Sequence, residues 1–133
     1  MTVEVDLPYV VAEVSAAFAA YEKALTSNDV ATLDALFHKD SRTIRYGIGE
    51  NLYGYDAIAA FRSARNPAGL MRDLSKTVIT AYGRDTAVAA TLFHRSSASG
   101  KTGRQMQTWV RFAEGWRIVA AHVSLIDTPD ERA

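Results

Sequence analysis

The chain has 133 residues, of which 48% are hydrophobic and 23% are charged, and its 15 basic and 15 acidic residues give a formal net charge of zero. This length and composition are typical of one soluble domain with a real hydrophobic core, which we place at residues 1–133. The interspersed charges give no support for binding to nucleic acid or to an acidic membrane surface, and the absence of cysteine excludes disulfides and thiol catalysis.

The sequence also argues against a membrane or secreted location. No apolar run approaches the ~20 residues that cross a bilayer. The first seven residues are acidic rather than basic and lack the apolar core of a signal peptide. We therefore expect a cytoplasmic protein, in agreement with the lack of cysteine.

Two helical patterns fill the first part of the chain. Pro8 suits the first turn of a helix, with Asp6 as a candidate cap, and the helix is expected to end near Ser27. Asn28 and Asp29 then cap a second, shorter helix. The apolar stripe of the first helix, at three- and four-residue steps, consists of Val11, Val14, Phe18, Tyr21 and Leu25. The buried face of the second consists of Leu33, Leu36 and Phe37.

A short strand over residues 41–47 carries the most informative side chain. Alternation places Thr43 and Arg45 on one face of this strand, with Ile44 and Tyr46 on the other. Both faces of such a strand are often covered, and a buried guanidinium is costly unless an anion meets it. The anion that Arg45 requires is either a protein carboxylate or a ligand.

The remaining pattern predicts a helix and then a sheet. A turn rich in glycine precedes a helix over residues 55–65, with Ile58 and Phe61 facing inward, and residues 66–69 stop it. Four strands follow, over residues 71–82, 86–97, 103–112 and 116–126, joined by tight turns as a meander of hairpins. We therefore predict an α+β fold, in which three helices pack on a strongly curved, mostly antiparallel sheet and form a cone with an internal pocket.

Two sets of motifs resemble known families. The last strand, which starts Gly-Trp-Arg-Ile-Val at residue 115 and ends Ala-His-Val-Ser at residue 124, resembles the nuclear-transport-factor-2-like superfamily, also described as SnoaL-like or cystatin-like. The segments Arg-Tyr-Gly at 45–47, Tyr-Gly-Tyr-Asp-Ala-Ile at 53–58 and Phe-Arg-x-x-Arg at 61–65 resemble the AtzH-like family. The resemblance covers about residues 8–125. It implies a place in ureide catabolism, because members of that family are found beside amidases of oxalurate and cyanuric acid breakdown, the latter belonging to atrazine degradation.

Arg45 and Tyr21 are the smallest plausible site. The planar guanidinium of Arg45 matches a carboxylate, and the hydroxyl of a buried Tyr21 needs a partner. The AtzH-like resemblance implies the same catalytic pair, with Arg45 binding a carboxylate and Tyr21 acting as acid or base. The structural alternatives are an ion pair of Arg45 with Asp40 or Glu50, and a core tyrosine bonded to a backbone carbonyl.

Six further side chains are candidate substrate contacts around this pair. Tyr46 and Tyr55 belong to the motifs that carry the family resemblance. The others lie on the two last strands, where an inward face would line the pocket, and where a structural histidine or a dimer interface is the alternative. They are Gln107, Trp109, His122 and Ser124. Arg62 and Arg65, one helical turn apart, are expected on a solvated face, and a second anion site is the alternative.

Several kinds of site lack their motif. The three histidines have no metal-ligand spacing, no glycine-rich phosphate loop is present, and no GxSxG elbow offers a nucleophilic serine. We therefore expect neither a metal nor another cofactor.

Two functions remain open at the level of sequence. One is an enzyme that hydrolyses or decarboxylates a small carboxylated urea or ureide, such as oxalurate or a product of cyanuric acid breakdown. The other is a non-catalytic protein that binds such a metabolite or serves a pathway amidase. In both cases we expect a homodimer through the sheet, because aromatic and aliphatic side chains occur on both of its faces.

Overall fold

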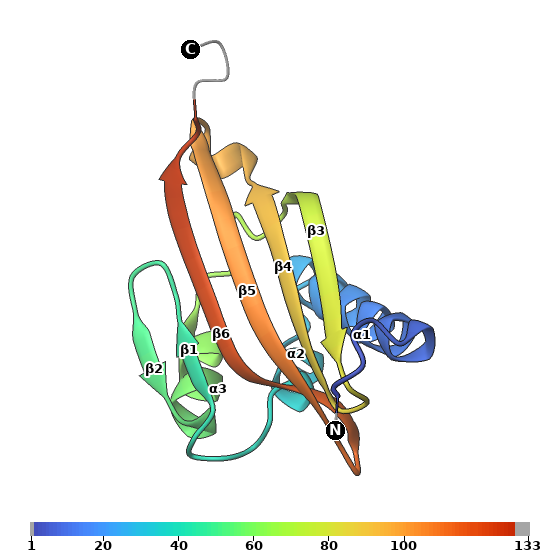
Figure 1. The fold of residues 1–133 in the computed structure, drawn as a ribbon. Helices are drawn as coiled ribbons and strands as arrows, with labels where there is room; N and C mark the ends of the chain where they lie inside the picture. Colours follow the sequence, from blue (N-terminus) through green and yellow to red (C-terminus); the bar gives the residue numbers. More distant parts are fainter. Residues whose placement is uncertain (1, 130–133) are drawn as a thin grey trace.

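The computed structural model describes residues 2–129 as a curved six-stranded sheet with three helices on one of its faces, which we call the inner face (Figure 1). The strand order is β2-β1-β6-β5-β4-β3, and β1 pairs with β6 in parallel while the other pairs are antiparallel. The elements are α1 (Pro8–Thr26), α2 (Val30–Leu36), β1 (Ile44–Tyr46), β2 (Asn51–Tyr53), α3 (Tyr55–Ala64), β3 (Asp73–Tyr82), β4 (Thr86–His94), η1 (Ser96–Ala98), β5 (Lys101–Phe112) and β6 (Gly115–Asp127). The predicted α+β cone is confirmed, although the sheet is curved rather than closed.

Of the two N-terminal helix caps that the sequence predicts, one is confirmed and the other is wrong. Asp29 caps α2 as expected, accepting the backbone N–H of Thr32 at 3.2 Å. Asp6 does not cap α1, whose capping residue Leu7 has no side-chain acceptor. The Asp6 carboxylate instead accepts the backbone N–H of Ala81 at 2.9 Å, which ties the N-terminal segment to the end of β3. The carboxylate of Asp6 can accept a backbone N–H at the start of a helix or from a strand, so its sequence position alone does not decide between the two.

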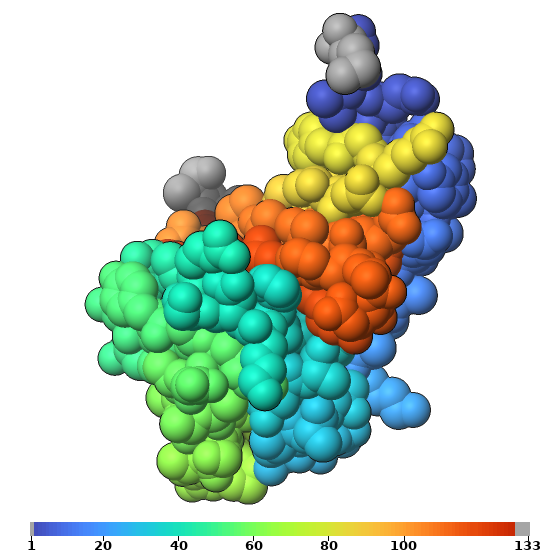
Figure 2. Space-filling model, turned by 90° about the horizontal axis from the view of Figure 1, so that it is seen from below, coloured from blue at the N-terminus to red at the C-terminus, as the bar shows by residue number. Residues whose placement is uncertain are grey.

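The glycine-rich segment after β1 contains a strand that the sequence pattern did not predict. Residues Asn51–Tyr53 form β2, which pairs with β1 and is only three residues long. A strand of three residues gives almost no alternation, so the three surrounding glycines dominate the pattern. The β1–β2 hairpin and α3 lie together on one side of the molecule, away from the β3–β4 turn (Figure 2).

The core lies between the helices and the inner face. In β4 alternate residues from Ala87 to Phe93 are buried, as period-two alternation requires. The Phe93 ring lies so close over Gly103 of β5 that an added Cβ there would sit 2.2 Å from it. Glycine is therefore required at this position by packing. None of the helices within residues 2–129 combines the length and the apolarity that crossing a membrane requires.

A β-bulge in β6 decides which of its side chains face inward. Thr108 pairs with Ala120 and the next residue, Trp109, pairs with Ile118, so Val119 is an extra residue without a partner on β5. An extra residue reverses the alternation beyond it. Ile118 is buried before the bulge and Ala121 after it, a spacing of three rather than two.

Candidate functional site

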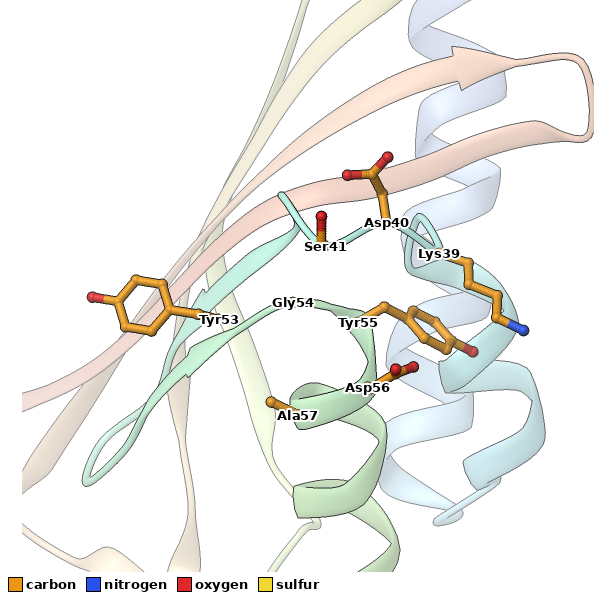
Figure 3. Close-up of a pocket in the computed structure, with 8 residues that line it drawn as sticks. All are labelled: Lys39, Asp40, Ser41, Tyr53, Gly54, Tyr55, Asp56 and Ala57. Carbon is orange, nitrogen blue, oxygen red and sulfur yellow. The ribbon is translucent and has the colours of Figure 1, made fainter.

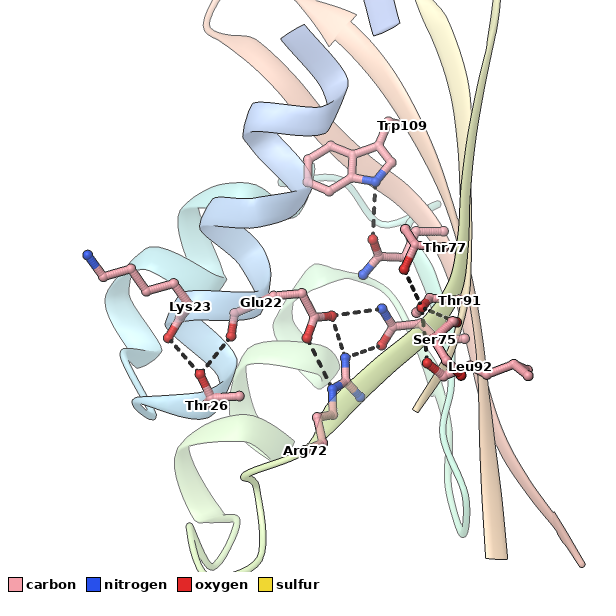
Figure 4. Close-up of polar contacts among 11 residues, drawn as sticks. Glu22, Lys23, Thr26, Arg72, Ser75, Thr77, Thr91, Leu92 and Trp109 are labelled. Atoms are coloured by element: carbon pink, nitrogen blue, oxygen red, sulfur yellow. Dashed lines mark hydrogen bonds and ion pairs between the residues drawn. The ribbon is translucent and has the colours of Figure 1, made fainter. Parts of the chain in front are cut away.

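Five arginines gather on the inner face and its edges, and three of them have a carboxylate partner. The most buried is Arg72, whose side chain is 1% exposed. It donates from Nε to Glu22 of α1 at 3.1 Å and from Nη2 to the amide oxygen of Gln105 at 3.0 Å (Figure 4). The Glu22 carboxylate compensates the charge of Arg72. Because Glu22 belongs to α1 and Gln105 to β5, the contacts of Arg72 join α1 to the sheet.

Arg62 is the second compensated arginine. Its guanidinium donates to Asp34 of α2 at 2.7 Å and lies 4.8 Å from the centre of the Phe37 ring. The expectation that Arg62 lies on a solvated face is wrong, because the residue is buried. It faces inward on the same helix face as Ile58, four residues earlier, and joins α3 to α2.

Arg45 is the third, and it is bound by Glu50. The two side chains meet across the β1–β2 turn at 2.9 Å, with Arg45 11% exposed and Glu50 23% exposed. Gly47 leaves room for this pair, since a Cβ there would lie 1.7 Å from Glu50 Oε1. Of the two partners that the sequence offered for Arg45, the structure therefore shows Glu50.

Arg65 and Arg95 have no such partner. Arg65 follows the last residue of α3, and Arg95 follows the last residue of β4. The buried Nε and Nη2 of Arg65 and the buried Nε of Arg95 make no hydrogen bond within residues 2–129. Burial lowers the pKa of both guanidinium groups, and neighbouring cations, Arg45 among them, lower it further.

These two arginines and Arg45 line one pocket of about 210 Å³ at the edge of the inner face. Its other lining residues come from the β1–β2 turn, α3, the loop after α3 and β6; they are Ile48, Glu50, Phe61, Asn66, Ala68, Gly69, Leu70 and Val123. Arginine stays protonated in proteins, so the lining carries three positive charges against the single negative charge of Glu50. The lining therefore has an excess of positive charge, carried by groups whose planar donors match a carboxylate.

Tyr21 is a buried side chain of α1. The side chain is 3% exposed, and its ring centre is 6.4 Å from that of Phe37. The Tyr21 phenol is among the groups that act on the pKa of Arg65 and Arg95, but Tyr21 is not one of the residues that line the pocket. The structure thus places Arg45 in the pocket wall and Tyr21 in the hydrophobic core.

Gln107 and Trp109 of β5 lie on the inner face and are fully buried. The Trp109 indole donates to Gln107 Oε1 at 3.1 Å, and because an indole N–H only donates, it fixes the orientation of the amide. Gln107 Nε2 is left without a partner within residues 2–129. Gln107 shares a row of the sheet with Arg45, separated by Ala121 of β6.

Three of the expected pocket residues lie on the other, outer face of the sheet. His122 and Ser124 are turned outward by the bulge at Val119, and with Arg104 and Met106 they line a hollow of about 460 Å³ there. Tyr46 is also outside, where its ring lies edge-on to His122 at 6.2 Å. The expectation that these side chains line the inner pocket is therefore not met, and for β6 the extra residue is the reason.

Tyr55 lies away from the inner pocket as well. It starts α3, and its hydroxyl donates to the backbone carbonyl of Asp34 at 3.2 Å. Tyr53 and Tyr55 point in opposite directions around a separate hollow at the start of α3 (Figure 3). Tyr55 thus holds α3 against α2, and its expected place among the pocket residues is not met.

Arg95 is the site residue that the sequence analysis missed, although it continues the inward alternation of β4, two residues after Phe93. Arg65 was expected on a solvated helix face, with a second anion site as the alternative, and the structure places it in the pocket wall, three residues after Arg62. Within residues 2–129, no cluster of histidine and carboxylate side chains has the arrangement of a metal site.

Comparison with known families places the chain among small α+β proteins. The model of the AtzH-like family matches residues 3–129. Comparison with curated proteins gave no match.

Solved structures extend this similarity. A protein of unknown function from Pectobacterium atrosepticum, assigned to the DUF3225 family, is 63% identical with a TM-score of 0.90 over 92% of this chain and 95% of its own. A cystatin-like fold protein from Burkholderia xenovorans is 47% identical with a TM-score of 0.92, covering 96% and 99%. At 16% identity, an NTF2-like protein of unknown function from Pseudomonas putida shares the fold with a TM-score of 0.71, covering 87% and 86%.

Proposed function

The chain belongs to the AtzH-like family, and from this membership and the cationic pocket we propose that it binds a small carboxylated urea or similar ureide and acts on it without a cofactor. The observation that carries the proposal is the excess of positive charge in the pocket, where three arginines face one carboxylate. Guanidinium groups bind carboxylates through paired, charge-assisted hydrogen bonds. The family context of oxalurate and cyanuric acid breakdown supports a ureide as the bearer of that carboxylate.

In the reaction we propose, the arginines hold the carboxylate and Tyr21 handles a proton. If the reaction is decarboxylation, the bond between the urea nitrogen and the carboxylate carbon breaks, carbon dioxide leaves, and the electron pair on nitrogen takes a proton from the Tyr21 hydroxyl. The phenol then regains a proton from water. If it is hydrolysis, water attacks the carbonyl carbon, the bond from that carbon to the leaving nitrogen breaks, and the Tyr21 hydroxyl protonates the nitrogen and regains a proton from the attacking water.

Replacement of Tyr21 by phenylalanine tests this role directly. The variant keeps the ring that packs near Phe37 and loses only the hydroxyl. We expect turnover of a carboxylated ureide to fall by about 10²–10⁴-fold. Binding, measured by calorimetric titration, should stay within a few-fold of the wild type because the arginines remain. Unchanged turnover in Tyr21→Phe would remove Tyr21 from the mechanism.

One observation favours a second candidate function. Among the residues that line the pocket, Glu50 is the single carboxylate, and it is held by Arg45. A pocket without a free base suits a protein that binds a carboxylated metabolite, or serves a pathway amidase, without catalysis. Binding of ureides by the wild type with no turnover, together with retention of an amidase of the pathway on the tagged protein, would favour this role.

We also propose that the protein forms a homodimer through the outer face of the sheet. Large apolar side chains are exposed there, and Met106 in the middle of β5 is 55% exposed beside the hollow at His122. We expect Met106→Glu to convert the dimer to a monomer in sedimentation velocity at micromolar concentration. Ser63→Glu on the exposed side of α3 is the matched control and should leave the dimer intact. A monomeric wild type would show that this proposal is wrong.

A further inference from the structure

We propose that Arg65 and Arg95 make the first contact with an anionic ligand in this pocket, and that Glu50 is an internal carboxylate which a second anionic group must displace from Arg45. The inference rests on the proposed function only in taking the ligand to be a small anion. It changes the order of importance that the sequence suggests, because Arg45 was the expected carboxylate-binding residue, whereas Arg65 was expected on a solvated face.

The first step of the argument is that Arg45 is already satisfied. Its Nη1 donates to Glu50 Oε1 at 2.9 Å, and its guanidinium also lies 5.8 Å from the centre of the Phe61 ring. A monoanion that bound to Arg45 would have to take the place of a carboxylate of the same chemistry and the same charge. Such an exchange brings little gain in free energy, because one charge-assisted hydrogen bond replaces another.

The second step is that Arg65 and Arg95 have buried N–H groups that donate no hydrogen bond to any other group within residues 2–129. Buried hydrogen-bond donors are satisfied in the great majority of structures. Here Nε of both arginines and Nη2 of Arg65 are buried and unpaired within residues 2–129, and both side chains line the pocket. The Arg95 guanidinium is supported from one side by the Phe93 ring at 5.0 Å. An incoming anion gains these hydrogen bonds without breaking any.

The third step concerns how Glu50 is held. Its second carboxylate oxygen accepts the backbone N–H of Gly49 at 3.1 Å, so Glu50 is anchored to the β1–β2 turn as well as to Arg45. Gly47 gives the carboxylate the space that it occupies. At 23% exposure, the side chain lies at the pocket wall rather than in the core and has solvent to move into. Glu50 therefore competes with a ligand for Arg45 at a position the ligand can reach.

The experiment is a calorimetric titration with two probes at constant ionic strength, acetate as the monoanion and malonate as the dianion. It compares the wild type with Arg95→Met, Arg65→Met, Arg45→Met and Glu50→Gln, and uses Arg84→Met in the exposed β3–β4 turn as the control. Circular dichroism confirms that each variant is folded. Arg95→Met and Arg65→Met are both included, so that if one of them does not fold, the other still tests the proposal.

We expect Arg95→Met and Arg65→Met each to weaken both probes by about tenfold or more, in line with the loss of a charge-assisted pair. Arg45→Met should leave acetate unchanged and weaken malonate only, and Glu50→Gln should tighten malonate. If Arg45→Met weakens acetate as much as Arg95→Met does, the inference is overturned while the proposed anion site stands. If the wild type binds neither probe, or if every variant binds both equally, the inference and the proposed function both fail.

Discussion

Replacement of Arg95 by methionine is expected to raise the midpoint of thermal unfolding of the free protein, and to reduce the stabilisation that a bound carboxylate provides. In the free protein, Arg95 is a partly buried cation that has no carboxylate partner within residues 2–129 and lies next to other cations. Uncompensated buried charge opposes folding, and apolar residues of similar volume are often better tolerated. Methionine keeps the apolar part of the side chain against Phe93, so we expect a gain of about 1 kcal/mol.

With a bound carboxylate, Arg95→Met has the opposite effect on the free energy of unfolding, because the variant loses stabilisation by the ligand. This loss is expected to be larger than the gain in the free protein. A ligand at one hundred times its dissociation constant adds ~2.7 kcal/mol to the wild type. Differential scanning calorimetry with and without malonate measures both effects in one series. Arg45→Met is the matched comparison, because it leaves Glu50 unpaired and should not raise the midpoint. A lower midpoint for Arg95→Met without ligand would contradict the view that this residue is kept for binding at a cost in stability.

The largest loss of stability is expected from Glu22→Ala. Arg72 is almost completely buried, and Glu22 supplies the compensating carboxylate from α1 across to the sheet. Removing one partner of a buried ion pair leaves an uncompensated charge and typically costs about 3–5 kcal/mol. Urea unfolding followed by far-ultraviolet circular dichroism should show a lower midpoint at an unchanged slope.

A double-mutant cycle separates the charge from the packing. Glu22→Leu combined with Arg72→Met removes both charges and keeps apolar volume at both positions. We expect the double variant to be more stable than either single variant, because no buried charge is left alone. A cost for Glu22→Ala below ~1 kcal/mol, or additive effects in the cycle, would show that Arg72 finds another partner or enough water.

The prediction from sequence succeeded for elements in which the apolar pattern repeats over many residues. The nineteen residues of α1 and the nine of β4 repeat their apolar positions often enough to fix which side faces the core. The hairpin meander followed from turn residues at regular spacing. Family resemblance in the last strand agreed with these patterns, and the cystatin-like neighbours share the same architecture.

The prediction failed where one residue changes the outcome. The extra residue Val119 in β6 turns His122 and Ser124 to the outer face, and no local sequence signal marks such a bulge. β2 is too short to show alternation at all. In both cases the structure depends on pairing with a neighbouring strand that sequence patterns do not contain.

The site was predicted in part for a different physical reason. Arg45 and Tyr21 were singled out by chemistry and family motif, and the structure places Arg45 in the cationic pocket and Tyr21 in the core. Arg65 was expected on a solvated helix face, with a second anion site as the alternative, and Arg95 was not considered. Which charges remain unpaired depends on Asp34, Glu22 and Glu50, whose partners are 28, 50 and five residues away. That balance of charge is a property of the fold.

The central claim is that the pocket recognises the negative charge of a small ureide, and a titration with oxalurate and its uncharged amide analogue tests it most directly. The two compounds have nearly the same shape and differ mainly in charge. We predict calorimetric binding of oxalurate to the wild type, with at least tenfold weaker or no binding of the amide. Equal binding of the two compounds, or binding of neither, would contradict the account.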